Sequence, residues 1–433
     1  MVSKRYSFIL AIVFSIVFYF SYVYFLNFYF EYANFPIHQH SIITLIISFM
    51  LAALPSVFYN GFKEISSFIA IFIYILLYIP TIVCVAIGLN IDPVTKFIVQ
   101  LVFFASITLF LLADRIILFK QNKRFKKFIS FKFILILTIL FTLVPLYVYR
   151  GNLRFVSFNE VYTQRFSNMD IGDDLFTSYI TTWLSSLLIP LCVLYGIITK
   201  KMLYFLVGLG SSVILYMATA SKGTILMPFI LYGLYFLLVR FGLKNMYSVL
   251  LLSLAGLMSL LLVVTTGPES PIFIVTSILL WRVVGTGGHL NFIYYDFFTT
   301  HPYIYYSHIG PVNAITHSYP YGDLVISRVV GQYYWTAEMN ANANFWATDG
   351  IASLGMLGVL IISVVFFFLL ILLNSITRNY NKMFLVLLFI PFLGTLLNTS
   401  LFQSMWSGGG LFIMLLLFFL KTDYKSIYTL PHS

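Results

Sequence analysis

Two basic residues stand among apolar neighbours, where a charge has a high cost. Arg282 lies in the stretch 281–285 (WRVVG), and Lys222 lies in the short connection 220–223 (ASKG) between two apolar segments. An arginine guanidinium is planar and makes paired, charge-assisted hydrogen bonds with phosphate oxygens. At a bilayer surface the phosphorylated partner at hand is a lipid headgroup or a lipid diphosphate, so these positions are candidates for binding one.

Two acidic residues, Glu338 and Asp349, lie at the end of a long polar connection, just before the next apolar segment. A carboxylate in such a place could act as a general base and take a proton from a hydroxyl group. Either could equally be the structural ion-pair partner of an arginine. The sequence leaves both interpretations open.

The same connection is rich in aromatic residues, which are mixed with Asn, Asp, His and Glu. Aromatic rings at a membrane interface commonly form a belt at the level of the lipid headgroups. A sugar also suits this mixture, because its C–H faces stack on rings and its hydroxyls need polar partners. Both interpretations stay open at this point. The aromatic residues in question are Trp281, Tyr294, Tyr295, Tyr303, Tyr305, Tyr306, Tyr319, Tyr321, Tyr333, Tyr334, Trp335 and Trp346.

Patterns for soluble cofactor chemistry are missing from the sequence. No glycine-rich nucleotide motif follows a strand pattern. The pair His38 and His40 is a small set for a zinc site, and Asp173-Asp174 is more typical of a loop turn than of a metal-binding pair. We therefore expect no cofactor and no bound metal.

The elements that must position these residues are membrane helices. Of the 433 residues, 61% are hydrophobic and only 9% are charged, whereas a soluble domain carries about 25% charged residues. Long apolar runs satisfy their own backbone hydrogen bonds in lipid when they are helical. The cysteines, Cys84 and Cys192, lie inside such runs and indicate neither a disulfide nor a metal cluster. The sequence predicts an all-α, polytopic integral membrane protein with a single membrane domain over 1–433 and about twelve transmembrane helices, at roughly 6–28, 41–60, 67–89, 97–119, 133–149, 177–199, 202–219, 224–240, 247–266, 350–373, 383–402 and 408–420.

Lysine and arginine residues fall mainly on alternate connections between these predicted spans. The largest group fills 120–132, and smaller groups follow at 200–201, 240–244, 378–382 and 421–425. The positive-inside rule assigns these connections, and with them both chain ends, to the cytoplasm. Topology thus explains the net charge of +11, and we expect no nucleic-acid partner.

Seven basic residues lie on the opposite side under this topology. Arg282 and Lys222 are the two introduced above, and Arg165 and Arg328 are weaker examples of the same pattern. An interfacial position or an ion pair explains the other three, which lie near predicted helix ends. These three are Lys96, Arg150 and Arg154.

Two connections on the outer side are long. The first runs over 150–176 and the main one over 267–349. A connection of the second length is usually functional or disordered, and its aromatic and apolar content argues against disorder. We expect it to contain short amphipathic or re-entrant interfacial helices at the membrane surface.

Short segments of this chain resemble a known family. The stretch 342–358 (NANFWATDGIASLGMLG) resembles the sequence before a late helix in bacterial O-antigen polymerases (Wzy-type, oligosaccharide repeat-unit polymerases). The stretches 301–310 and 319–321 are similar to that family's large periplasmic loop, as are 162–165 (YTQR) and 221–223 (SKG) to further segments of it. Many members carry an arginine at the position of Lys222, which keeps the charge but lacks the planar fork.

The resemblance implies a multi-pass glycosyltransferase of the bacterial inner (cytoplasmic) membrane, GT-C-like, with its active face in the periplasm. Such a polymerase transfers a growing glycan from undecaprenyl diphosphate to the non-reducing-end sugar of a lipid-linked repeat unit in lipopolysaccharide or polysaccharide biosynthesis. Its partners would be the undecaprenyl-diphosphate-linked oligosaccharide and membrane lipid, and a separate chain-length co-polymerase could act with it.

The resemblance also implies roles for the residues singled out above. Cations would cradle the diphosphate, whose developing charge needs them more than it needs a protonating acid. Asp349 or Glu338 would deprotonate or orient the acceptor hydroxyl. The expected diphosphate ligands are Arg282, Arg328, Lys222 and Arg165, and the expected sugar ligands are His308, Tyr319, Trp335 and Trp346.

Three other functions compete with this one. A flippase for the same lipid-linked glycan would need polar residues within its spans, which here are poor in charges. An O-antigen ligase would share the helix count and the large outer loop but would attach the polymer to lipid A-core. A non-catalytic assembly partner would use the loop to bind proteins.

Many lipid-linked glycosyltransferases carry metal-binding acids in the first outer loop. Here that loop, 31–40, has a single acid, Glu31, so we expect no divalent-metal requirement.

Overall fold

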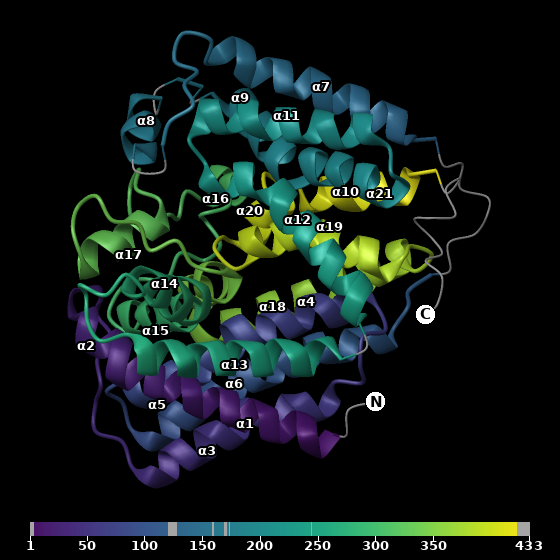
Figure 1. Ribbon diagram of the computed structural model, residues 1–433. Helices are drawn as coiled ribbons and strands as arrows, with labels where there is room; N and C mark the ends of the chain where they lie inside the picture. Colours follow the sequence, from purple (N-terminus) through teal and green to yellow (C-terminus); the bar gives the residue numbers. More distant parts are fainter. Residues whose placement is uncertain are drawn as a thin grey trace. The chain divides into compact units, whose positions relative to one another are not determined.

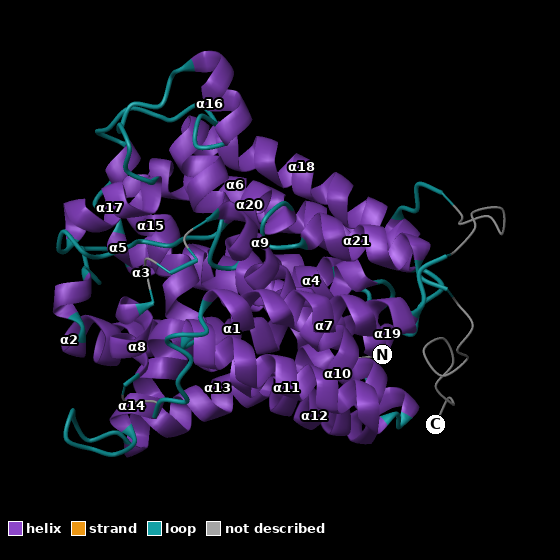
Figure 2. Ribbon diagram, turned by 90° about the horizontal axis from the view of Figure 1, so that it is seen from above, coloured by secondary structure: helices purple, strands orange, loops and turns teal. Residues whose placement is uncertain are grey.

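The computed structural model of this chain describes residues 4–119, 128–157, 160–168, 171–172, 174–243 and 245–421. The basic residues predicted at 120–127, together with Asp173, Lys244 and Lys425, lie outside these ranges. Within them the chain is built from helices and loops, and the one departure is an isolated β-bridge between Ile129 and Leu420 (Figure 2). The expectation of an all-α fold is confirmed for the described residues.

Eleven helices among the described residues are long and apolar enough to cross a membrane. The chain is therefore a multi-pass membrane protein. Two shorter apolar helices, Ile42–Phe58 and Lys382–Leu396, accompany them. The eleven are Lys4–Tyr29, Ile65–Gly88, Pro93–Arg115, Phe131–Val148, Leu175–Thr199, Met202–Thr219, Lys222–Phe241, Met246–Val264, Phe273–Phe298, Trp346–Thr377 and Leu401–Phe419.

The helices agree closely with the apolar runs of the sequence. Every predicted span coincides with one of these helices or with one of the two shorter ones. One long helix, Phe273–Phe298, was not predicted as a span and falls inside the connection expected over 267–349. The number of membrane crossings stays a prediction.

Contacts between Cα atoms divide the chain into two compact units. Unit 1 comprises 1–117, 244–372 and 396–402, and unit 2 comprises 118–243, 373–395 and 403–433. Unit 1 thus contains the main connection and most of the predicted site residues. Its helices are α1 (Lys4–Ser21), α2 (Asn27–Tyr29), α3 (Ile42–Ala53), α4 (Ile65–Ile73), α5 (Ile79–Gly88), α6 (Pro93–Leu112), α13 (Met246–Val264), α14 (Phe273–Ser277), α15 (Thr286–Phe298), α16 (Gly310–Thr316), α17 (Ile326–Tyr334) and the first part of α18 (Ala352–Thr377).

The unpredicted helix of unit 1 runs through α14 and α15. In Figure 1 its turns are seen end-on, while α1 and α13 run lengthwise across the view, and the turned view of Figure 2 agrees. It therefore runs across the direction of α1 and α13, and its second part, α15, packs on α5. The sequence predicted interfacial helices here, but shorter ones, because Arg282, His289 and Asp296 interrupt the apolar run.

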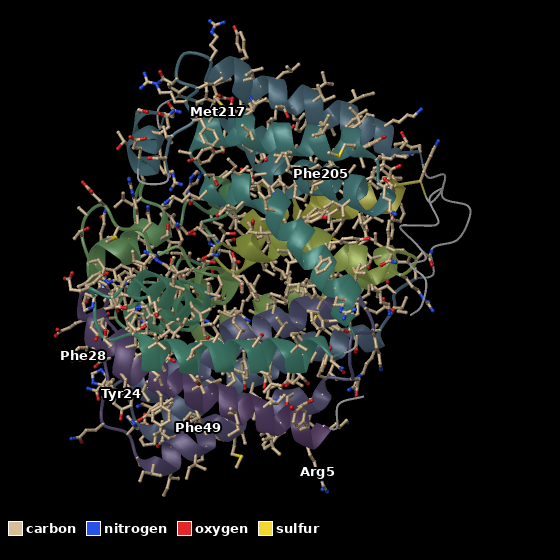
Figure 3. The ribbon with its side chains drawn as sticks, in the orientation of Figure 1. Arg5, Tyr24, Phe28, Phe49, Phe205 and Met217 are labelled. Atoms are coloured by element: carbon tan, nitrogen blue, oxygen red, sulfur yellow. The ribbon has the colours of Figure 1, made fainter. Side chains whose placement is uncertain are left out.

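Helix α1 has different residues at its two ends. Figure 3 shows Arg5 at one end of it, and Tyr24 and Phe28 beyond the other. Both aromatic side chains are largely exposed, at 68% and 72%. Aromatic rings are common at both membrane interfaces, so these positions fit the ends of a membrane span, and the orientation stays a prediction.

Buried polar side chains join the lengthwise helices of unit 1. Gln100 on α6 donates to Ser48 of α3 (2.8 Å) and to the carbonyl of Ile82 on α5 (3.0 Å). Lys96 Nζ donates to the carbonyl of Ala86 (3.0 Å), near the carboxyl end of α5. In lipid such groups need partners within the protein, so these bonds fix how the three helices pack.

The long helix after the main connection is broken near its start. Leu354 and Gly355 have non-helical dihedral angles, and Gly355 has a φ of 60°. The short helical segment Trp346–Ile351, before the break, folds back on the part of α18 after the break. Trp346 Nε1 donates to Ser363 Oγ (3.0 Å) and joins the two parts. A Cβ at Gly358 would collide with the Gly350 carbonyl. Glycine is therefore required where the two arms meet.

Unit 2 is a second group of helices with close glycine contacts. A Cβ at Gly196 of α10 would lie 2.5 Å from the backbone nitrogen of Phe205 on α11, a residue that Figure 3 labels. Thr142 of α7 donates to Ser211 of α11 (2.8 Å). Its helices are α7 (Phe131–Val148), α8 (Val161–Ser167), α9 (Leu175–Trp183), α10 (Ile189–Thr199), α11 (Met202–Thr219), α12 (Lys222–Phe241), most of α19 (Lys382–Leu396), α20 (Leu401–Met405) in part and α21 (Gly410–Phe419).

Candidate functional site

Unit 1 contains a cavity of about 370 Å³ with an arginine in its wall. Two tryptophans, one histidine and three asparagines line the cavity with Arg282. They give the cavity both apolar faces and hydrogen-bonding groups. A second hollow, of about 520 Å³, is lined by 38–41 alone and is much more open to solvent. We take the first as the candidate site. Its lining residues are Tyr32, Ala33, Trp281, Arg282, Thr286, His289, Leu290, Trp335, Met339, Asn340, Asn342 and Asn398.

Arg282 is positioned by a stretch of π-helix, Ile278–Gly285, that joins α14 to α15. Such wide turns leave backbone groups for other partners and often occur at functional sites. Here the Thr286 hydroxyl donates to the carbonyl of Trp281 (2.7 Å). The Arg282 guanidinium lies 4.7 Å from the centroid of the Trp281 ring. A cation–π contact of this kind directs the guanidinium without occupying all of its donors.

The first wall of the cavity is formed where α15 packs on α5 and on the loop after α2. Gly287 and Gly288 permit the approach, because a Cβ at Gly288 would lie 2.5 Å from the Thr81 nitrogen. His289 then stacks on Phe35 with ring centroids 3.8 Å apart. Its Nε2 lies 3.0 Å from the carbonyl of Ala33, so that nitrogen carries the ring's proton. The wall is thus built of tightly packed elements.

The opposite wall follows α17 and the chain after it. Gly331 of α17 lets the backbone of Met339 pack against the helix. Ala341 is held from both sides, because its N–H donates to the Ser327 carbonyl (2.8 Å) and its own carbonyl accepts from the Tyr294 hydroxyl (3.0 Å). Its neighbours in the sequence, Asn340 and Asn342, contribute their exposed side chains to the cavity.

A buried amide network anchors this second wall to the first. Asn344 donates to Asn291 Oδ1 (3.0 Å), and its own Oδ1 accepts from the Trp346 N–H (3.0 Å). Asn291 in turn donates to the hydroxyl of Thr81 (2.8 Å). Because buried amides are costly unless paired, this chain of bonds specifies one arrangement of α15, α5 and the segment before α18.

The chemistry of the cavity suits a phosphorylated sugar. Arg282 can make two parallel hydrogen bonds with phosphate oxygens. The asparagine amides can donate to and accept from sugar hydroxyls, and the rings of Trp281 and Trp335 offer flat apolar faces. A volume of about 370 Å³ is in the range of small-ligand pockets.

A second cluster of unit 1 surrounds Asp349, whose side chain is fully buried. The carboxylate accepts from His308 Nε2 (2.8 Å), from the hydroxyl of Ser400 (2.6 Å) and from the backbone N–H of Leu401 (2.5 Å). It thereby ties three distant parts of the sequence together. Ser400 lies two residues after Asn398 of the cavity wall, which limits the distance between their Cα atoms to about 7 Å.

No protein-family model matches this chain, and neither a curated protein nor a solved structure matches it. The function must therefore be argued from the chain's own residues. The resemblance found in the short motifs stays a prediction.

The structure brings some of the predicted site residues of unit 1 together. Arg282 in the π-helical stretch and Trp335, directly after α17, both line the cavity. His308 and Asp349 form a hydrogen-bonded pair. Trp346 is fully buried and stacks on Phe110, so its ring offers no face to a sugar.

Three other predicted residues of unit 1 lie outside the cavity lining. Arg328 is an exposed residue of α17, and Glu338 is exposed in the turn that follows this helix. The Tyr319 hydroxyl donates to the carbonyl of Leu324 (2.7 Å), within its own loop. Burial and the neighbouring Tyr321 raise the pKa of Tyr319 to about 12, so the hydroxyl stays protonated at neutral pH.

The two predicted cations of unit 2 lie close to one another. Arg165 of α8 donates to the carbonyl of Ala220 (3.3 Å), two residues before Lys222. Asn168, just after α8, donates to the carbonyl of Ala218 (2.8 Å). The segments 162–165 and 221–223, which the sequence singled out separately, therefore meet at one turn between α11 and α12.

The structure gives other polar residues specific partners. Lys96 was interpreted from the sequence as interfacial or paired with an acid, but it is buried and bonds a helix-end carbonyl. Asp174 caps α9 by accepting from the Thr177 N–H (2.9 Å), and this bond lowers the pKa of its carboxyl. The described residues contain no group of three metal-binding side chains. Both cysteines are buried and form no disulfide.

Sequence reasoning missed several polar residues of the cavity, among them one histidine and three asparagines. His289 was given no role, and it is buried. Asn340, Asn342 and Asn398 were given no role. The adjacent Gly287-Gly288 pair was a usable indication for His289, since two glycines in a helix mark a close approach of another backbone. The asparagines carry no such pattern.

Proposed function

We propose that this protein is an oligosaccharide repeat-unit polymerase of the O-antigen type. It transfers a growing glycan from a polyprenyl diphosphate to the non-reducing-end sugar of a lipid-linked repeat unit. The observation that carries this proposal is the cavity of unit 1, which Arg282 lines together with two tryptophans and three asparagines. A membrane protein whose site can bind both phosphate and sugar groups suits a sugar that is linked to a lipid diphosphate.

In this proposal Arg282 binds the diphosphate that leaves. Negative charge grows on its oxygens as the glycosidic carbon separates from it, and a fixed cation stabilises that charge. Trp281 and Trp335 hold the apolar faces of the adjoining sugar. The amides of Asn340, Asn342 and Asn398 bond its hydroxyls. A lipid-borne donor reaches the site through the bilayer, so no nucleotide-binding domain is needed.

We also propose in which membrane, and on which side of it, the protein acts. In the proposal the cavity end of unit 1 lies on the outer side of the bilayer, as the positive-inside rule predicts for the main connection. For this class of enzyme that side is the periplasmic face of the bacterial inner membrane. Arg282 is the principal diphosphate ligand of the cavity in this proposal. Arg165, Lys222 and Arg328 lie outside the cavity lining, and their roles stay predictions. A separate co-polymerase would set the chain length.

Purified protein in liposomes tests the proposal directly. Polyprenyl-diphosphate-linked repeat units are added, and the products are separated by size. We expect a ladder of glycans that grow by whole repeat units, with the polyprenyl diphosphate released. Transfer of lipid-linked units to the other leaflet without new glycosidic bonds would show a flippase, and transfer only to lipid A-core would show a ligase. Either result would contradict the proposal.

A further inference from the structure

His308 and Asp349 form a pair in which the acid is hidden and the histidine is not. Nε2 of His308 lies 2.8 Å from Oδ1 of Asp349, and the carboxylate side chain is 0% exposed while the imidazole is 12% exposed. Of these two side chains, only the histidine therefore has surface that a ligand could contact.

Asp349 cannot itself take a proton from a ligand hydroxyl in this arrangement. One of its oxygens accepts from both His308 and Ser400, and the other accepts from the backbone N–H of Leu401. A backbone N–H cannot turn away, and the carboxylate has no exposed surface. The candidate for the general base is therefore His308, the residue that Asp349 binds, and not Asp349 itself.

The carboxylate fixes the protonation pattern of the histidine. Because Nε2 donates to Asp349, the neutral ring carries its proton there and has its lone pair on Nδ1. Nδ1 is buried and has no hydrogen-bond partner within the protein. A buried acid that orients an imidazole, with the second nitrogen left for chemistry, is the arrangement found in hydrolytic triads.

The loop that carries His308 is held in a costly conformation. Tyr305 and Tyr306 both have left-handed backbone angles, with φ of 45° and 63°. Such conformations are unfavourable for residues other than glycine and persist only where the surroundings impose them. Here the N–H groups of Ile304 and Tyr305 donate to the carbonyls of Ala352 and Ser353, at the broken start of α18. These two hydrogen bonds to the start of α18 thereby fix the loop that carries His308.

Tyr306 supplies a second unused group beside the pair. Its hydroxyl oxygen is buried and has no hydrogen-bond partner. Burial, and then the negative charge of Asp349, raises the pKa of Tyr306, so the phenol stays protonated and can donate. A ligand hydroxyl could accept from Tyr306 while it donates to His308 Nδ1.

We propose that His308 is the catalytic residue that receives the proton of the acceptor hydroxyl, with Asp349 as its positioning residue. This inference rests on the proposed polymerase function. The acceptor oxygen forms a bond with the anomeric carbon of the donor sugar as the bond from that carbon to the diphosphate oxygen breaks. The electron pair leaves with the lipid diphosphate, and the hydroxyl proton moves to Nδ1, from which water later removes it.

The acceptor must reach Nδ1 by a small movement of the loop 303–308. Catalytic hydrogen bonds commonly tighten only when substrate is bound. The chain itself brings the pair near the cavity, because Ser400 on the carboxylate is two residues from Asn398 in the cavity wall. The proposal requires the donor sugar to extend from Arg282 toward this pair.

Chemical rescue in the liposome assay tests the inference. His308→Ala should lower the rate of polymer formation at least about 100-fold, the usual contribution of a general base. Imidazole in the buffer should restore part of that rate, because it can fill the space and accept the proton. His308→Gln, which can still donate to Asp349, should be equally inactive. Asp349→Asn should lose activity that imidazole does not restore.

The matched control is His317→Asn, which changes an exposed histidine of the same connection whose left-handed backbone an asparagine tolerates. It should leave the rate unchanged. Near-normal rates for both His308 variants would overturn the inference, and so would losses that imidazole cannot relieve in folded protein. If the wild-type protein makes no polymer, the proposed function fails first, and this inference fails with it.

Discussion

Arg282→Ala should abolish polymer formation while the protein remains folded in the membrane. Removing one preorganised charge-stabilising group costs about 100–1,000-fold in rate in other enzymes. A doubly charged leaving group should place this site at the upper end of that range. Arg282→Lys should retain part of the activity, since it keeps the charge but loses the planar fork. The measurement is the rate of glycan extension on lipid-linked repeat units.

Arg154→Ala provides the control for this prediction. Arg154 is also an exposed arginine on the predicted outer side, but it is not in the cavity lining. Its variant should extend glycans at the wild-type rate. An Arg282→Ala protein that makes polymer of normal length at a normal rate would remove Arg282 from the site. It would also take away the main support for the proposed function.

Gly288→Ala should destabilise the protein, although alanine is the better helix former by about 1 kcal/mol. The added methyl group would lie 2.5 Å from the backbone nitrogen of Thr81 on α5, so one helix must move. Overpacking of a close contact typically costs about 1–3 kcal/mol. Because His289 follows directly, the same movement should widen the cavity and weaken substrate binding.

Gly256→Ala is the matched substitution. Gly256 lies in helix α13, and a Cβ there would meet nothing within 4 Å. Its variant should melt at the wild-type temperature or slightly above it, whereas Gly288→Ala should melt several degrees lower. Thermal unfolding of the detergent-purified proteins measures both. Equal melting temperatures would show that α15 does not pack on α5 as described.

The lengthwise helices could be predicted from the sequence because lipid leaves few alternatives to an apolar helix of about 20 residues. Some boundaries were also within reach. The span predicted at 97–119 begins at Pro93, where Asp92 caps it by accepting from the N–H groups of Val94 and Thr95 (both 3.0 Å). An aspartate followed by proline is a common helix start. The crosswise helix was missed because its charged residues interrupt the apolar run.

The site was harder to predict because its parts meet only in three dimensions. Residue types alone singled out Arg282 and Trp335, yet nothing in one sequence shows that they share a cavity. The same limit affected Asp349. Its position before a span suggested a base, and only the bonds from His308, Ser400 and Leu401 reveal that it is enclosed. Trp346 was grouped with surface aromatics, but the fold-back against α18 buries it.

The most direct test of the proposed function is made in the bacterium that carries this gene. The gene is deleted, and the surface polysaccharide is separated by size on a gel. A polymerase predicts that the ladder of long glycans collapses to lipid A-core that carries a single repeat unit, and that the intact gene restores the ladder. Loss of even the single capped unit would contradict the account and would point to a ligase, a flippase or an earlier step.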